Sequence, residues 1–386
     1  MLGVPPSICR KPMSAPESSA PSNPQGPIPH RKVIRQWLTP LSAPSTPIAL
    51  GLVALDLALF AACLWLVVAA PSAWMQVTVA IVEGLVIARL FILGHDACHQ
   101  SLTAHRGLNR WVGRLVFLPS LTTFSLWEVG HNLVHHNHTN MSGLDNVWRP
   151  FSPAEYRALP AWRQALERVY RSGWAPGLYY LIEIWWTKLW FPNRRQMPTR
   201  RPAFLHDSLL VTAGALAWIA GLAAAAHATG QSPVWLLFVG FALPFLIWNG
   251  VMGFVVYVHH THAEIEWYDD EMAWHEAKPY VTTTVHLTFR AGLGALLHHI
   301  LEHTAHHVDM RIPLYRLRAA QAVLDEKLAG HIVVQPFSWK WYARTARTCK
   351  LYDYQARCWT DFEGRPALAA EPKPPAATTA GVATLG

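Results

Sequence analysis

Four long apolar runs dominate the pattern of hydrophobic and polar positions along this chain. They cover residues 48–70, 75–93, 209–226 and 234–258, and each is close to the roughly 20 helical residues that cross the hydrocarbon core of a bilayer. Only short linkers separate the two members of each pair, residues 71–74 in the first and residues 227–233 in the second. The pattern therefore predicts four transmembrane helices arranged as two hairpins.

The segments around these runs divide the chain into three parts. Residues 1–45 contain a stretch rich in Pro and Ser, expected to be disordered to about residue 36, and then approach the membrane. Residues 46–335 form the predicted membrane domain. Residues 336–386 are expected to be a C-terminal cytoplasmic segment that ends in a disordered tail. With 52% hydrophobic and only 15% charged residues among 386, the chain is apolar for a soluble protein, and we expect an all-α integral membrane protein.

The distribution of Lys and Arg predicts how the helices are oriented. Neither short linker contains one of the 32 basic residues, whereas five precede residue 46, thirteen lie between residues 100 and 205, and thirteen follow residue 258. Because basic residues accumulate on the cytoplasmic side of membrane proteins, both termini and the central segment are predicted to be cytoplasmic. In a bacterium this would be the inner membrane. The basic residues are dispersed and accompany no nucleic-acid motif, so the net charge of +8 indicates topology and contact with membrane lipid rather than nucleic acid.

Histidines supply the candidate chemistry, because fourteen of the 21 fall in four short clusters. The clusters are His95 and His99; His131, His135, His136 and His138; His259, His260 and His262; and His298, His299, His303, His306 and His307. Residues three or four apart share one face of a helix, so each cluster can direct imidazoles to a common point. The predicted topology puts all four clusters at the cytoplasmic side, by an argument that does not use the histidines.

So many imidazoles indicate a metal centre with more than one ion. A structural zinc site needs four ligands, usually with cysteines, and the five cysteines here form no CxxC pair. Cys98 lies within the first cluster but off the face shared by His95 and His99, so we do not expect it to be a ligand. Imidazole suits iron, zinc, copper and nickel alike, and ligand type alone leaves the metal open.

The histidine motifs resemble those of the membrane fatty acid desaturase family, which also includes hydroxylases and ketolases. That family has three histidine boxes, and here they stand in the family's order as His95/His99, His131/His135/His136 and His303/His306/His307. The segments HNLVHHNHTN at 131–140, HHTH at 259–262 and EHTAHH at 302–307 are similar to bacterial acyl desaturases of the delta-12 or omega-6 type. The resemblance covers about residues 45–335.

This resemblance implies a ligand set for two non-haem iron ions under a cytoplasmic helical cap. The eight box histidines would bind the irons and carry catalysis: His95, His99, His131, His135, His136, His303, His306 and His307. We choose His260 as the ninth ligand because its position before Thr261 and His262 matches the family's HTH pattern, with His259 and His262 as alternatives. Asp96 is expected to accept the N–H of a ligand imidazole and so set its tautomer, and Asn140 to act similarly.

The reaction implied is oxygen-dependent desaturation of a long acyl chain carried as a lipid or a thioester. Dioxygen would be a co-substrate, and electrons would come from a separate ferredoxin or cytochrome b5-like protein. An apolar channel would hold the chain, with Trp127, Trp148, Trp267 and Trp274 as candidate lining residues.

Three other reactions use the same kind of centre: acyl hydroxylation, triple-bond formation by an acetylenase, and oxidation of a carotenoid by a ketolase or hydroxylase. A metal transporter would instead require ionisable ligands near the middle of its membrane helices, whereas these clusters lie at or beyond the ends of the apolar runs. A non-catalytic lipid-binding scaffold would tolerate loss of single histidines, and none of the boxes is degraded.

Overall fold

The computed structural model describes residues 27–145, 147–193, 199–277 and 279–367. Its main feature is a set of four long apolar helical segments, each long and apolar enough to cross a membrane. They are α2 (Thr46–Ala69), α3 (Ala73–Cys98), α9 (Pro202–Thr229) and the continuous segment Pro233–His260. The last comprises α10 (Pro233–Leu237), the π-helical η4 (Phe238–Ala242) and α11 (Leu243–His260). The four predicted apolar runs are confirmed as helices, with ends that differ by up to seven residues from the predicted ones.

The residues at their C-terminal ends explain why α2 and α9, the first helices of the two pairs, stop where they do. The chain leaves α2 at Ala70 in an extended conformation, and Pro71 follows it. Helix α9 ends at Gly230, whose φ of +70° allows its N–H to bond back to the carbonyl of Ala226. A left-handed glycine of this kind is the usual way to close an α-helix.

Helix α3 is the central helix of the structure. It packs against α2, α11 and α4 (Arg106–Phe117). Two glycines permit this close packing. A Cβ at Gly84 would lie 2.5 Å from Cβ of Ile247, and one at Gly94 would lie 2.3 Å from the Phe117 ring. By contrast, α2 leaves large apolar side chains such as Trp65 and Leu55 exposed, as expected for a surface that faces lipid.

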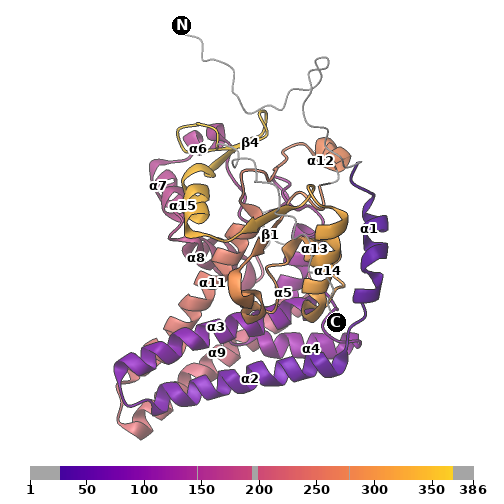
Figure 1. Ribbon diagram of the computed structural model, residues 1–386. Coiled ribbons are helices and arrows are strands. Elements are labelled where there is room, and N and C mark those ends of the chain that lie inside the picture. The colour runs from indigo at the N-terminus through magenta and orange to yellow at the C-terminus, as the bar shows by residue number, and fades with distance from the viewer. Residues whose placement is uncertain (1–26, 146, 194–198, 278, 368–386) are drawn as a thin grey trace, which may run out of the picture.

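Most of the other described elements lie together at one end of these helices and are called the cap here, whereas α4 packs alongside α3 (Figure 1). Before the second apolar pair the other elements are α1 (Arg31–Leu38), η1 (Thr39–Leu41), α4, α5 (Phe124–Trp127), η2 (Glu128–His135), α6 (Pro153–Ala158), α7 (Ala161–Tyr170), α8 (Pro176–Tyr179) and η3 (Tyr180–Leu189). After it they are α12 (Glu271–Ala277), β1 (Val285–Thr288), η5 (Arg290–Leu297), α13 (His303–Val308), α14 (Leu314–Lys327), β2 (Val333–Pro336), α15 (Trp339–Thr348), β3 (Leu351–Asp353) and β4 (Cys358–Thr360). Figure 1 shows the turn between α2 and α3 at the end of the molecule far from α13.

The four strands correct the prediction of an all-α protein. Strand β1 pairs in parallel with β2, with Val285 opposite Val333, and β3 pairs antiparallel with β4, with Tyr352 opposite Trp359. Each strand has only three or four residues, which is too short to show a clear alternation of hydrophobic and polar residues in the sequence. The partner strand is either distant in the chain or joined by a short turn. The protein is nevertheless mostly helical.

The predicted N-terminal tail also needs correction where the structure describes it. Disorder was expected to about residue 36, but α1 begins at Arg31 and places Ile34 and Leu38 in the core. The C-terminal segment is folded through α15, β3 and β4, and the Trp359 side chain is fully buried. The remaining predicted disorder, in residues 1–26 and 368–386, lies outside the described residues.

Candidate metal centre

Nine buried or nearly buried histidines converge at the end of the long helices and form two adjacent groups. The first group is His95, His99, His131, His136 and His306, and the second is His135, His260, His303 and His307. Within each group, one ring nitrogen from every residue lies within 4.8 Å of the others. These are the same nine histidines that the sequence analysis singled out, so the structure brings the whole predicted set together.

The first group joins three separate parts of the chain. His95 is in the last turn of α3, and its Nε2 lies 2.8 Å from Nε2 of His131 and 3.2 Å from Nε2 of His99. Nε2 of His136 lies 3.1 Å from that of His131 and 3.0 Å from that of His306 in α13. The chain thus directs five Nε2 atoms toward one small volume.

The local helix type decides how the second histidine box is divided between the groups. Segment η2 is a π-helix, and the N–H of His136 bonds to the carbonyl of His131, five residues earlier. In this geometry His131 and His136 face the same way, with ring centroids 4.6 Å apart, while His135 faces the second group. The α-helical spacing assumed from the sequence would instead have paired His131 with His135.

The second group lies between η2, α11 and α13. His303 and His307 are one α-helical turn apart in α13, with ring centroids separated by 4.5 Å. Nε2 of His260, the last residue of α11, is 3.3 Å from Nε2 of His303. The ring of His135 is 4.9 Å from the rings of His260 and His307.

The other histidines of the four clusters lie outside both groups. His259 stacks on the ring of His303 at 3.8 Å, and His262 contacts the amide of Gln335 at 3.3 Å. His138 bonds to the carbonyl of Val134 at 3.1 Å. Among the three candidates for the ninth ligand, only His260 points a nitrogen at other members of a group.

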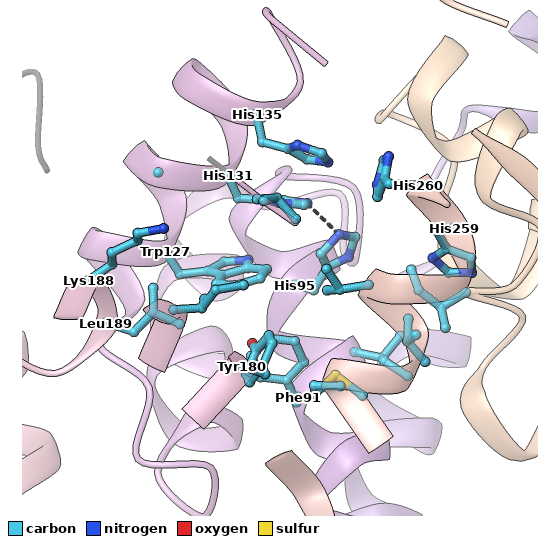
Figure 2. A pocket seen from close by; sticks show the side chains of 18 of the residues that line it. Phe91, His95, Trp127, His131, His135, Tyr180, Lys188, Leu189, His259 and His260 are labelled. Atoms are coloured by element: carbon cyan, nitrogen blue, oxygen red, sulfur yellow. Dashed lines mark hydrogen bonds between the residues drawn. The ribbon is translucent and has the colours of Figure 1, made fainter. Parts of the chain in front are cut away.

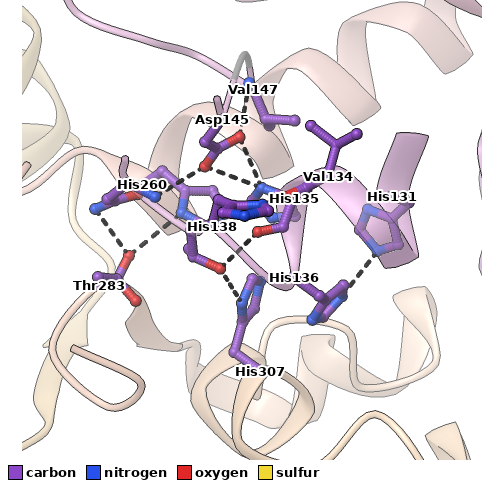
Figure 3. A network of polar contacts seen from close by, with 12 residues as sticks. His131, Val134, His135, His136, His138, Asp145, Val147, His260, Thr283 and His307 are labelled. Atoms are coloured by element: carbon purple, nitrogen blue, oxygen red, sulfur yellow. Dashed lines mark hydrogen bonds and ion pairs between the residues drawn. The ribbon is translucent and has the colours of Figure 1, made fainter. Parts of the chain in front are cut away.

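Four of the nine rings have a polar partner at Nδ1, which leaves Nε2 directed toward the centre. Nδ1 of His95 is 3.3 Å from Asp96, and Nδ1 of His260 is 3.3 Å from the carbonyl of Thr283. Nδ1 of His307 is 3.2 Å from the hydroxyl of Thr139, and Nδ1 of His135 is 3.0 Å from Asp145 (Figure 3). Such partners set the tautomer and orientation of a ligand imidazole.

Asp145 is a candidate functional residue that the sequence did not predict. It is fully buried, contacts His135 with both oxygens, and accepts backbone N–H groups from Asn140 and Val147. Burial raises its pKa, but the charge and hydrogen bond of His135 act in the opposite direction, and the net pKa lies below its usual value. Asp145 lies outside the histidine boxes, ten residues after His135, and its distance in the sequence from the histidines follows no helical spacing that would have pointed to this contact.

Asn140 differs from what the sequence analysis expected. Its side-chain amide does not contact an imidazole but donates to the carbonyls of Glu266 and Thr283, at 3.0 and 3.3 Å. Because the Thr283 carbonyl also contacts His260, Asn140 is linked to that ring through the backbone. Its φ of +60° is one that asparagine tolerates better than most residues.

Burial keeps six of the histidines outside the long helices in the neutral form that binds metals. It lowers the pKa of His99, His131, His136, His303, His306 and His307 well below the usual value, and neighbouring histidines lower it further. Neutral imidazole is the metal-ligating form.

The donor set fits two metal ions. Two imidazole nitrogens that bind one ion at about 2.1 Å, at right angles, lie about 3 Å apart. The Nε2 separations that link the rings here are 2.8–3.3 Å. Nε2 of His307 is buried and has no hydrogen-bond partner among the described residues, so this atom is free to bind a metal ion.

Comparison with known proteins identifies the family. A family model described as fatty acid desaturase matches residues 72–339, which include all nine histidines. The chain belongs to the fatty acid desaturase family. It is 30% identical over 304 residues, 78% of this chain and 83% of the relative, to an sn-1 oleoyl-lipid 12-desaturase of Picosynechococcus. It is also 30% identical over 72% of its length to the same type of enzyme in Arthrospira platensis, covering 76% of that relative. A chloroplastic omega-6 fatty acid desaturase of Glycine max is 28% identical over 73% of this chain and 62% of the plant protein.

In this member of the desaturase family an apolar cavity adjoins the histidine centre (Figure 2). Its walls come from α3, η2, η3 and α11 and include Phe91, Tyr180 and Met252. The histidines His95, His131 and His260 also line it. Trp127 lines the cavity and stacks on His131 with ring centroids 4.7 Å apart. Of the other three candidate tryptophans, Trp148 and Trp267 are buried in the core, and Trp274 lines a different pocket.

Proposed function

We propose that this protein is an oxygen-dependent acyl desaturase of the delta-12 or omega-6 type. It would introduce a cis double bond into an acyl chain that already carries one and so form a methylene-interrupted diene. The observation that carries the proposal is the apolar cavity that reaches two groups of buried histidines, in a chain of the fatty acid desaturase family. The relatives' names, 12-desaturase and omega-6 desaturase, support the position of the new bond.

The nine histidines would hold two iron ions, with His260 as the ninth ligand. When bound, the irons would supply the oxygen activation needed to remove two hydrogens from an unactivated pair of methylene groups. The chain itself orients the ligands: Asp96 and Asp145 accept the Nδ1 protons of His95 and His135, and Trp127 packs flat against His131. The apolar walls exclude water and fix which carbons lie beside the centre.

The favoured substrate is an oleoyl chain carried on a membrane glycerolipid. The two cyanobacterial relatives quoted above are named as acting on an sn-1 oleoyl-lipid. A free thioester remains the alternative carrier. The cavity gives no specific support to hydroxylation, triple-bond formation or carotenoid oxidation, and these reactions are alternative outcomes of the experiment below.

The long helices are proposed to cross the membrane as two hairpins, with the histidine centre, its helical cap and both termini on the cytoplasmic side. In support, the turns at residues 70–72 and 230–232 contain no Lys or Arg. His95 and His260 lie at the opposite ends of their helices from these turns. The electrons would come from a separate cytoplasmic carrier, a ferredoxin or a cytochrome b5-like protein.

Expression in a host whose lipids contain oleate but no dienes tests the reaction. Gas chromatography with mass spectrometry of the fatty acids should reveal a linoleate-type diene, and the purified protein should contain two irons per chain and little zinc. The variant His306→Ala, expressed at the same level, should give no diene. An alcohol, an alkyne or an oxidised carotenoid as the sole new product would contradict the desaturase assignment while leaving the metal centre intact.

A further inference from the structure

A second pocket reaches the histidine centre from the surface of the cap. It lies between α1, α12 and residues 279–283, and its inner wall includes His136 and His307. These two rings stack 4.3 Å apart, and each belongs to a different group of the centre. Figure 3 shows them side by side, and Figure 1 shows α1 running alongside α13. The pocket thus gives access to both proposed metal positions at once.

The outer wall of this pocket is cationic. Helix α1 contributes Arg31, Lys32 and Arg35, and Lys32 is exposed to solvent. Arg31 and Arg35 donate to the carbonyl of Val308 at 3.0 and 2.9 Å, and Arg31 also donates to the carbonyl of His307. Burial, followed by the charge of Arg35, lowers the pKa of Arg31 to about 10, which still leaves it positively charged at neutral pH.

Carboxylates do not cancel this charge at the pocket wall. Among the residues that the structure describes, none of those lining the pocket is acidic. The nearby Asp309 acts on Arg31 and Arg35 but is shared with Arg311 at 2.7 Å, so this one carboxylate faces three arginines. Glu271 on α12 is exposed and does not line the pocket. An anionic partner is therefore favoured at the α1 side of the pocket.

The pocket and the apolar cavity approach the centre from different sides, and they have no described lining residue in common. The cavity reaches His95, His131, His135, His259, His260 and His303, whereas the pocket reaches His136 and His307. An anionic headgroup bound in the pocket could not also place its acyl chain in the cavity without passing through the histidines. A partner that transfers only electrons does not meet this obstacle, because electrons need proximity rather than a channel.

We infer that this pocket is the docking site of a small acidic one-electron carrier protein, with Lys32 and Arg35 at the contact and His136 and His307 as the nearest groups of the centre. The inference rests on the proposed desaturase function. Two reduced carriers dock in succession, and each is oxidised by one electron. Dioxygen accepts these two electrons and two more from the two C–H bonds that break. Together with two protons from solvent, the two hydrogens leave in two molecules of water.

Charge reversal at Lys32 tests the inference on the full-length, iron-loaded protein with a plant-type [2Fe–2S] ferredoxin as the carrier. Lys32→Glu should raise the Kd for ferredoxin and the KM for reduced ferredoxin about tenfold at low salt. The difference should shrink at high salt because the contact is screened. Iron content, kcat at saturating ferredoxin and the KM for the oleoyl lipid should remain those of the wild type.

The matched control is Lys340→Glu, which reverses an exposed lysine on α15. It should leave the Kd for ferredoxin unchanged. As a readout independent of turnover, carbodiimide should couple a ferredoxin carboxylate to the Lys32 amine with loss of water, and Lys32→Ala should abolish the mapped cross-link.

Three results would overturn the docking site: no change in Kd for Lys32→Glu, an equal change for Lys340→Glu, or a rise only in the KM for the lipid. The last would assign the pocket to a substrate headgroup. A wild-type protein that binds ferredoxin here but makes no diene would contradict the proposed reaction and support the docking site, so the two failures are distinguishable.

Discussion

Nδ1 of His135 lies 3.0 Å from Oδ1 of Asp145 and 3.1 Å from Oδ2, inside a region that solvent does not reach. The carboxylate fixes the tautomer of His135, so that Nε2 faces His260, His303 and His307. The same carboxylate accepts two backbone N–H groups and therefore ties the ring to the turn that follows η2.

We therefore expect Asp145→Asn to weaken the second histidine group. Loss of the negative charge lowers the basicity of the His135 imidazole, and replacement of such outer partners costs about 10- to 100-fold in metal affinity or activity. Iron per chain and diene formation measure the effect. Asp325→Asn is a matched control, because Asp325 also pairs with a histidine, His286 at 3.0 Å, but away from both groups. Equal losses in the two variants would contradict a specific role for Asp145.

The second prediction separates His260 from its neighbour His262. His260→Ala removes one of the four imidazole nitrogens in the second group, so we expect the protein to lose iron. Activity should fall by more than about 100-fold, which is the largest loss expected when a residue that only hydrogen-bonds a ligand is replaced. His262→Ala should keep its iron and most of its activity, since that ring contacts Gln335 and Trp341 instead. Iron analysis of the two purified variants decides between them. Iron loss in His262→Ala but not in His260→Ala would reverse the ligand assignment.

The sequence predicted the parts of this centre that depend on local pattern. Hydropathy marks the four long helices because a bilayer imposes length and apolarity on each of them separately. The nine histidines could be recognised from their spacing and from the resemblance to a known family. For His95 with His99, and for His303 with His307, the α-helical spacing also places both rings in the same group.

What the sequence did not predict depends on contacts between distant segments. The π-helix that turns His131 toward His136 is a departure from ordinary helical geometry, and no residue type marks it. Asp145 reaches His135 only after a turn held by Asn140 and Tyr268. Strand β1 finds its partner β2 forty-eight residues away, as Val285 and Val333 show. Such pairings are decided by packing and not by local propensity.

A third prediction concerns a charged network in the first helix pair. Asp56 in α2 is fully buried, and it lies 2.8 Å from Arg89 in α3 and 2.5 Å from His298 in the cap. Asp56→Ala removes the carboxylate that pairs with Arg89. Removing one partner of a buried ion pair lowers the free energy of unfolding by about 3–5 kcal/mol. We expect a lower Tm in detergent with unchanged iron content before heating. Glu363→Ala is the control, because it breaks only exposed ion pairs, with Arg365 at 3.3 Å and Arg168 at 3.8 Å, and should leave Tm close to the wild-type value. Equal Tm values for the two variants would contradict this reading.

The fourth prediction tests the membrane topology. Reporters fused after residue 45, within residues 150–170 or at the C-terminus should report the cytoplasm, and reporters inserted at Ser72 or Gly230 should report the opposite side. The reason is the absence of Lys and Arg from both turns. A non-cytoplasmic signal within residues 150–170 would separate segments that the structure packs together, since the Phe151 carbonyl accepts the N–H of Tyr352 in β3.

The last prediction asks whether the apolar cavity holds the acyl chain. Met252 lies on α11, is buried, and lines the cavity. Met252→Trp adds volume where a straight chain would lie, so kcat/KM for the oleoyl lipid should fall by at least tenfold, equivalent to about 1.4 kcal/mol of transition-state binding. Iron content should be unchanged, because Met252 is not a proposed ligand. Leu246→Trp introduces the same side chain on α11 at a position that is 48% exposed and does not line the cavity, and it should leave kcat/KM near the wild-type value. If Met252→Trp turns over the oleoyl lipid normally while retaining its fold and iron, the chain must reach the centre by another route, and the cavity assignment fails even if the diene is formed.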